Sequence, residues 1–288
     1  MTDLARADEL GVDDLVDPIL VAAFAGWNDA ADAASSTVDR LIEQWDAELV
    51  YELEPDDYYD FQVNRPHVAF TDLGTRHITW PTTRLYVARP ERAPRDLVLL
   101  RGVEPNMRWR PFCTEILAVA EKLDVRLAVA VGALLADVPH TRPIPVSGSV
   151  SDPELGARLG LEPSTYEGPT GITGVFHDLC AVADLPSLSL WAAVPHYVAQ
   201  PPCPKAMLAL LGRLEDLLEV PIDLGDLAEE ARAWEHDVDE LAREDTEVAE
   251  YVRSLEDARD ASELPEASGD AIARDFERYL ERRQRETE

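Results

Sequence analysis

The sequence predicts an α/β protein with a largely parallel sheet, followed by a C-terminal helical extension. An apolar run at Ile19–Phe24 has the character of a buried strand, and after a break at Gly26 it leads directly into an alanine-rich helix. A wholly apolar strand followed at once by a helix is typical of parallel sheets, because both faces of such a sheet are covered. Strand and helix patterns then alternate as far as Pro204, and beyond it the pattern is purely helical.

The elements follow in chain order. The first helix is expected over 29–45, with Asn28 or Asp29 as its N-cap and apolar residues every three or four positions. Pro111 suits the first turn of a second helix that ends near Leu123. The run 125–135 is almost wholly apolar and is predicted to be the central strand. The remaining strands are expected at 47–53, 67–70, 77–80, 85–88, 97–100 and 188–194, and a helix ending near residue 183 follows the glycines at 168, 171 and 174.

The last quarter of the chain is helical and acidic. A heptad-spaced apolar stripe runs from Leu227 to Leu255 and is broken at Asp245, and a linker at 260–270 precedes a final helix around residues 272–280. Residues 213–288 contain 26 acids and 10 arginines, about half of the net charge of the chain. The predicted organisation is therefore a flexible acidic arm at 1–17, an α/β domain at 18–220 and an acidic helical extension at 221–288.

Composition restricts the classes of partner. The net charge of −31 excludes nucleic acid and anionic membranes as principal partners, because both would repel the chain. Three cysteines without CxxC spacing indicate reduced, structural thiols, and no apolar run is long enough to span a membrane. The predicted location is the cytoplasm.

Four polar turns follow predicted strands, at 26–29, 101–106, 137–142 and 195–197. In a parallel sheet these turns share one edge, where α/β proteins bind ligands. The alternative is that polar residues gather there because loops lie on the surface. The candidate ligand-binding residues are Trp27, Asn28, Asp29, Glu104, Asn106, His140, Arg142, Thr170, Gly171 and His196.

Three other motifs have both a functional and a structural interpretation. The glycines at 168, 171 and 174 either expose backbone N–H groups to an anion or form a tight loop before a helix, and the second interpretation is favoured. Histidines 140, 177 and 196 lack the i, i+4 spacing of a helical metal site, so no metal and no cofactor is predicted. On the heptad stripe, Trp234, Val238 and Leu241 are candidates for binding a partner helix, although such stripes more often pack on their own domain.

Several motifs together resemble the PAC2 family, which groups proteasome assembly chaperone 2 with bacterial and archaeal relatives. They are Ala23–Ala30, Gly102–Asn106, Gly132–Pro143 and Gly168–Gly174. The resemblance covers roughly residues 18–200 and implies a three-layer α/β/α body similar to nucleoside phosphorylases, in a homo-oligomer for which a trimer is one candidate. It supplies no catalytic residues. The eukaryotic chaperones of this group dock on proteasome subunits through a hydrophobic-Tyr-X tail, whereas this chain ends Arg285-Glu286-Thr287-Glu288, which puts that docking mode in doubt.

The leading hypothesis is a non-enzymatic, homo-oligomeric protein that binds another protein, with a proteasome-related partner among the possibilities. The competing hypothesis is a nucleoside- or phosphate-type site, in which Asn28, Asp29, Glu104, Asn106 and His140 hold a polar ligand and Arg101 or Arg142 a phosphate. A third, an ATP-grasp ligase, is weakened because the chain has only two lysines and no recognisable phosphate-binding loop.

Overall fold

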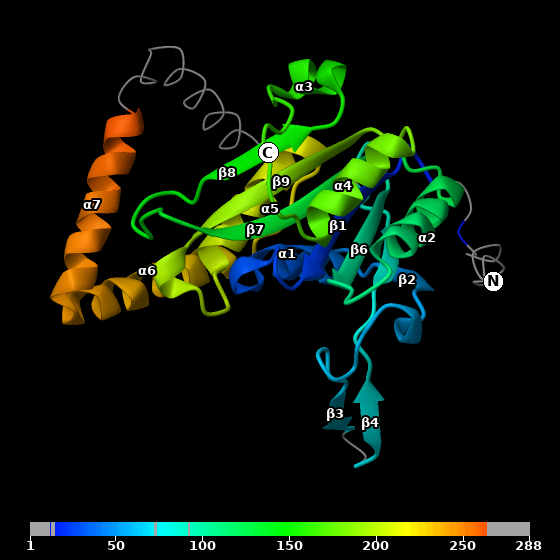
Figure 1. Ribbon diagram of the computed structural model, residues 1–288, viewed down its shortest axis with the longest axis horizontal. Coiled ribbons are helices and arrows are strands. Elements are labelled where there is room, and N and C mark those ends of the chain that lie inside the picture. Colours follow the sequence, from blue (N-terminus) through cyan, green and yellow to red (C-terminus); the bar gives the residue numbers. More distant parts are fainter. Residues whose placement is uncertain (1–11, 13–14, 72–73, 92, 264–288) are drawn as a thin grey trace.

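The computed structural model describes residues 12, 15–71, 74–91 and 93–263, arranged around a seven-stranded sheet (Figure 1). The strand order is β2-β5-β6-β1-β7-β9-β8. Four neighbouring strands run parallel: β6 (Leu97–Val103), β1 (Ile19–Ala25), β7 (Leu127–Ala136) and β9 (Ser187–Pro195). Antiparallel pairs complete both edges, through β5 (Arg84–Ala88) and β2 (Glu48–Glu52) on one side and β8 (Val146–Val150) on the other.

Helices cover both faces of the sheet, which confirms the three-layer prediction. Side chains of α1 (Ala33–Gln44) and α5 (Pro204–Leu218) pack in one core cluster with Val21 and Leu99. On the opposite face, α2 (Trp109–Lys122) and α4 (Ile172–Val182) pack with the alternate strand residues, such as Ala22 and Leu100. The parallel strands are apolar throughout because successive side chains point to opposite faces of the sheet and both faces are buried.

Two parts of the sheet differ from the sequence prediction. The middle position belongs to β1 and not to β7, which lies beside it. The long apolar run of β7 reflects its length, because it continues past the end of β1 and forms a bridge between Ala133 and Asp29. The edge strand β8 was not predicted, since the Ser147-Gly148-Ser149 segment carries no apolar alternation. The short helix α3 (Pro153–Leu159) was also missed, although Asp152 caps it and Pro153 occupies its first turn.

The C-terminal heptad stripe is divided between two helices, α6 (Leu227–Glu244) and α7 (Thr246–Glu263). Asp245 between them has an extended backbone, and its carboxylate accepts a hydrogen bond from the Glu247 N–H (2.9 Å) at the start of α7. The predicted start of the linker at residue 260 is wrong, because α7 continues through Glu263. The predicted final helix and most of the predicted acidic arm lie outside the described residues.

A separate two-stranded sheet, β3 (His67–Phe70) and β4 (Arg76–Thr79), projects away from the body (Figure 1). Among the described residues, no helix has the length and apolar character needed to cross a bilayer. The three cysteines are buried and unpaired, as predicted, and burial raises the pKa of the Cys113 and Cys180 thiols to about 12.

Candidate functional site

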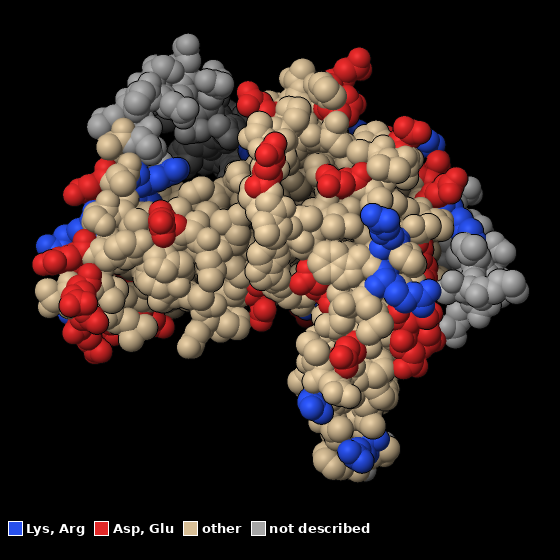
Figure 2. Space-filling view, viewed as in Figure 1, with Lys and Arg blue, Asp and Glu red and all other residues tan. Residues whose placement is uncertain are grey.

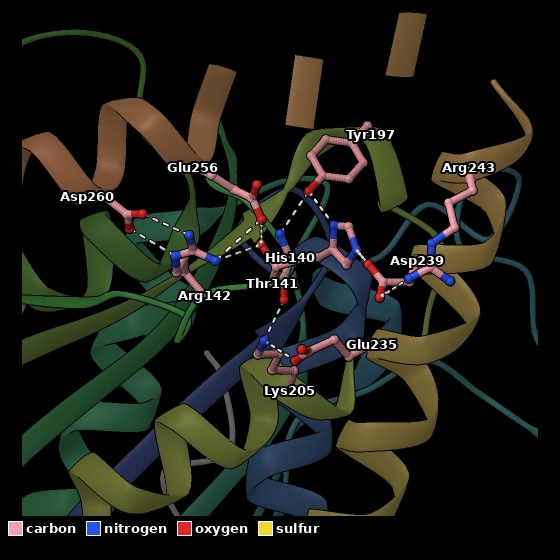
Figure 3. A network of polar contacts seen from close by, with 10 residues as sticks. All are labelled: His140, Thr141, Arg142, Tyr197, Lys205, Glu235, Asp239, Arg243, Glu256 and Asp260. Atoms are coloured by element: carbon pink, nitrogen blue, oxygen red, sulfur yellow. Dashed lines mark hydrogen bonds and ion pairs between the residues drawn. The ribbon is translucent and has the colours of Figure 1, made fainter. Parts of the chain in front are cut away.

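The predicted polar turns do lie along one edge of the sheet, because the four strands that they follow are parallel. Their side-chain contacts divide them into two groups. The first, the strand-end cluster, consists of Trp27, Asn28, Asp29, Glu104 and Gly171. The second, the clasp, joins the turn after β7 to the C-terminal helices and consists of His140, Thr141, Arg142, Tyr197, Lys205, Glu235, Asp239, Arg243, Glu256 and Asp260 (Figure 3).

The strand-end cluster is organised by the carboxylate of Glu104, which follows β6. Helix α4 begins after Gly171, which has no side chain to cap the first turn. Glu104 Oε1 instead accepts a hydrogen bond from the Ile172 N–H (2.9 Å), and its Oε2 accepts one from the Trp27 N–H (3.4 Å). The positive end of the helix dipole thus faces a carboxylate of the protein itself. This negative charge disfavours an anionic ligand at the glycine loop.

Position 171 requires glycine, because the side chains of Asn28 and Glu104 lie close to its backbone. A Cβ atom at this position would lie 1.9 Å from Asn28 Oδ1 and 2.9 Å from Glu104 Oε1. Loop 26–29 therefore packs directly against the start of α4, and three segments far apart in sequence meet at this point.

Asn28 and Asp29 each place a buried oxygen in this region. Asp29 is only 4% exposed, and its Oδ1 accepts hydrogen bonds from the N–H groups of Ala34 (2.7 Å) and Ser35 (3.2 Å) at the start of α1. The Asp29 carboxylate therefore satisfies N–H groups in the first turn of α1, as predicted for a capping residue, although the helix begins later than predicted and its N-cap position is Asp32. Asn28 Oδ1 and Asp29 Oδ2 have no partner among the described residues, and burial raises the pKa of Asp29. Both are acceptors that a water or a ligand N–H or O–H group would satisfy.

Replacing Glu104 by alanine is expected to lower the free energy of unfolding by about 1–2 kcal/mol, because α4 then loses both its cap and the charge at its dipole. Glu104→Gln retains the acceptor oxygen and loses only the charge, so we expect it to recover about half of that loss. Urea denaturation of the three proteins measures both effects. An alanine variant as stable as the parent would contradict the capping role.

Asn106 and Thr170 belong to neither group. Asn106 Oδ1 accepts hydrogen bonds from the Asp60 N–H (2.8 Å) and the Asn64 side-chain amide (3.0 Å), and so orders the segment before β3. The Thr170 hydroxyl lies 3.5 Å from the carbonyl oxygen of Gly171, within the glycine loop. Ligand binding by Asn106 and Thr170 stays a prediction.

His140 is the centre of the clasp and is fully buried (Figure 3). Its Nδ1 and its backbone nitrogen each lie 2.8 Å from the hydroxyl of Tyr197, and its Nε2 lies 3.1 Å from Asp239 Oδ1 on α6. These contacts fit a single assignment of protons. The backbone N–H donates to the tyrosine oxygen, the tyrosine O–H donates to Nδ1, and Nε2–H donates to Asp239. The neutral imidazole therefore has both nitrogens satisfied.

Further contacts connect the same turn to α5 and α6. Lys205 Nζ, on α5, donates hydrogen bonds to the backbone carbonyl of His140 and to the carboxylate of Glu235 on α6. Arg243, one turn further along α6, pairs with Asp239 (3.0 Å). Helix α6 is thus attached to the body by polar contacts beside its apolar packing on α5.

Arg142 attaches α7. Its guanidinium forms two hydrogen bonds with the carboxylate of Asp260, at 2.9 and 2.8 Å, and a third contact of 3.3 Å with Glu256. Thr141 also donates to Glu256. The other arginine considered for phosphate, Arg101, pairs with Asp39 on α1 (3.0 Å). Both arginines are therefore engaged by carboxylates of the protein itself.

His196 lies at the outer side of the clasp. Its Nδ1 is 3.2 Å from Asp137 Oδ1, and its ring stands edge-on to the rings of Tyr197 and Tyr251. The Tyr251 hydroxyl, on α7, donates to the same Asp137 oxygen (3.1 Å). Helix α7 thus contacts the turns after both β7 and β9.

Acidification is expected to weaken the clasp. Burial lowers the pKa of His140 below its usual 6.5, so the unfolded chain binds this proton more readily than the folded one. The stability contributed by neutral His140 is present in full above about pH 6.5 and falls as the pH drops through that value toward the lower pKa of the folded state. Urea denaturation of the parent and of His140→Gln from about pH 8 to about pH 5 measures this difference. His177, whose pKa burial also lowers, is common to both proteins and cancels. If the difference in the free energy of unfolding between the two proteins does not change with pH, the assignment of a neutral, buried His140 is contradicted.

The three predicted partner-binding residues have different environments. Val238 is buried and Trp234 packs against the core cluster that contains α5, whereas Leu241 is 61% exposed. Helix α6 therefore packs on the body, and α7 contacts the turn after β7. Partner binding by Leu241 stays a prediction.

Sequence reasoning placed Tyr197 in a strand-end turn without naming it as a site residue, and it missed Lys205 and Asp239 as partners of His140. Each lies far in sequence from His140, and no spacing pattern connects them. The sequence did contain one signal for these contacts. The C-terminal helices have an excess of acids, and the turn at 137–142 contains His140 and Arg142, which acids can bind.

The comparisons with known proteins agree with this architecture. The model of the PAC2 family matches residues 23–242. A PAC2 family protein from Streptomyces avermitilis is 60% identical, with a TM-score of 0.77 over 82% of this chain and 100% of the other. A proteasome-assembly chaperone homologue from Mycobacterium tuberculosis is 52% identical, with a TM-score of 0.74 over 81% of this chain and 99% of the other.

A more distant structure shares the fold alone. An archaeal proteasome activator from Pyrococcus furiosus is 17% identical, with a TM-score of 0.63 over 80% of this chain and 95% of the other. A comparison with proteins of curated function finds no match. The family match covers most of the chain, including the strand-end cluster and the His140 turn, and the chain belongs to the PAC2 family.

Proposed function

We propose that this protein binds other proteins as an assembly chaperone, that proteasome subunits are its partners, and that it acts as a homo-oligomer in the cytoplasm. The observation that carries the proposal is the way the protein's own side chains occupy the sheet edge where α/β proteins hold small ligands. Glu104 occupies the start of α4, and acids of α7 engage Arg142. The 52% identity to a proteasome-assembly chaperone homologue supports the choice of partner.

The small-molecule alternative has less support from this geometry. A phosphate would have to displace Asp39 from Arg101, or Asp260 from Arg142. The two buried oxygens of Asn28 and Asp29 are acceptors and offer nothing to a phosphate group. They are compatible with ordered water, which buried polar groups commonly bind.

The proposal is tested with purified components. The chain is mixed with recombinant proteasome α subunits and precursor β subunits of its own organism, and complexes are resolved by size-exclusion chromatography and native mass spectrometry. We expect a stable complex with one class of subunit and faster formation of half-proteasomes. A net charge of −31 also attracts basic surfaces without specificity, so an unrelated protein of similar charge serves as the control. No complex above that control, at low or physiological salt, would overturn the proposal.

A further inference from the structure

The β3–β4 hairpin is the part of the described chain with the least support from the body. All eight residues of its two strands are exposed, and the only ring contact at its base joins Phe61 to Trp80 among the described residues (4.7 Å between centroids). A two-stranded sheet without further packing is marginally stable in water. The described body therefore contributes little packing that would stabilise the hairpin.

One face of the hairpin is apolar. Val68 pairs with Ile78 and Phe70 pairs with Arg76 across the two strands, so these four side chains share a face. Val68 is 48%, Phe70 71% and Ile78 40% exposed, and Trp80, two residues beyond Ile78, is 44% exposed. Large apolar side chains grouped on one exposed face mark an interaction surface. The opposite face carries His67, Ala69, His77 and Thr79.

The charge of the hairpin is opposite to that of the chain. Residues 61–80 contain two arginines and one aspartate, with two histidines beside them, while the whole chain carries −31. Figure 2 shows the projection as mostly uncharged, with blue groups at its far end, whereas red groups predominate over the body. Two copies of so acidic a body repel each other, and a basic projection is the element that makes close contact favourable.

We propose that the apolar face of the β3–β4 hairpin docks on the acidic body of a second copy of this chain. Hairpin-to-hairpin contact would bring Arg76 of both copies together, so charge complementarity favours hairpin-to-body contact. Such a contact joins two different surfaces, the hairpin of one copy and the body of the next. The proposal deepens the proposed self-association and does not depend on the identity of the protein partner.

The test compares the mass in solution of full-length variants by light scattering and sedimentation velocity. Phe70→Glu combined with Ile78→Glu places two charges in the apolar face. We expect the dissociation constant of the oligomer to rise at least about tenfold. Ala69→Glu combined with Thr79→Glu is the matched control, because it adds the same two charges to the opposite face of the same hairpin. The hairpin residues contribute to neither core cluster, so both variants are expected to keep the unfolding midpoint of the parent at low concentration.

Arg76→Glu distinguishes hairpin-to-body contact from hairpin-to-hairpin contact. Docking on an acidic body predicts weaker assembly for this variant, and hairpin-to-hairpin docking predicts equal or stronger assembly, which would overturn the proposal. A monomeric parent at the highest soluble concentration would also overturn it. So would a Phe70→Glu/Ile78→Glu variant that stays oligomeric but loses its complex with proteasome subunits, since that result assigns the hairpin to the partner. Failure of the subunit-binding experiment alone leaves this measurement unaffected.

Discussion

Replacing His140 by alanine is expected to lower the free energy of unfolding by about 2–4 kcal/mol and to loosen the C-terminal helices. The side chain is fully buried, so its removal leaves a cavity and withdraws the partner of the Tyr197 hydroxyl. Asp239 loses its link to the body at the same time. Urea denaturation measures the stability, and limited proteolysis within α6 and α7 reports the loosening.

The chain offers a matched control for this variant. His236 lies on α6, is exposed, and among the described residues pairs with Glu240 one turn along the same helix. Its replacement by alanine is expected to change stability by less than about 0.5 kcal/mol. Equal effects at His140 and His236 would show that the clasp contributes nothing specific.

Replacing Phe24 by alanine is expected to be the most destabilising change, with a loss of about 3–5 kcal/mol. Phe24 is 1% exposed on the central strand, and its ring lies 5.9 Å from the ring centroids of both Phe112 on α2 and Phe176 on α4. The variant therefore removes the contact that joins both helices of one layer to the sheet.

Phe24→Leu separates the lost volume from the lost aromatic contacts. Leucine retains most of the apolar volume, so we expect a loss of about 1–1.5 kcal/mol. Denaturation at one fixed protein concentration keeps the contribution of assembly the same for the three proteins. A loss below about 1 kcal/mol for the alanine variant would show that α2 and α4 are held mainly by other contacts.

The parallel core of the fold was predictable because its signals are local. The run Ile19–Phe24 is apolar throughout, since its side chains enter two cores, and Asp29 is a good capping residue whose carboxylate satisfies N–H groups in the first turn of α1. Strand order was not predictable in the same way, because an apolar run reports burial and not position. This is why β7, longer than its neighbour β1, was mistaken for the central strand.

The missed elements depend on contacts between distant residues. Strand β8 is a strand because it pairs with β9, and its small polar residues give no period of their own. Similarly, Asp239 lies 99 residues from His140 and meets it only because α6 packs on α5. The break in the heptad stripe did have a local signal, since Asp245 is a good capping residue and its carboxylate caps α7.

The single extended residue between α6 and α7 has a kinetic consequence. Helix α6 is attached by four buried apolar residues and by the contact of Asp239 with His140. Among its described residues, α7 buries Val252 and Leu255, and its ion pairs with Arg142 are partly exposed, so that salt screens them. The two helices therefore form separate opening units, and amide hydrogens of α7 should exchange with solvent well before those of α6. Each opening of α7 separates the Tyr251 ring from the rings of His196 and Tyr197, which stay attached to the end of β9.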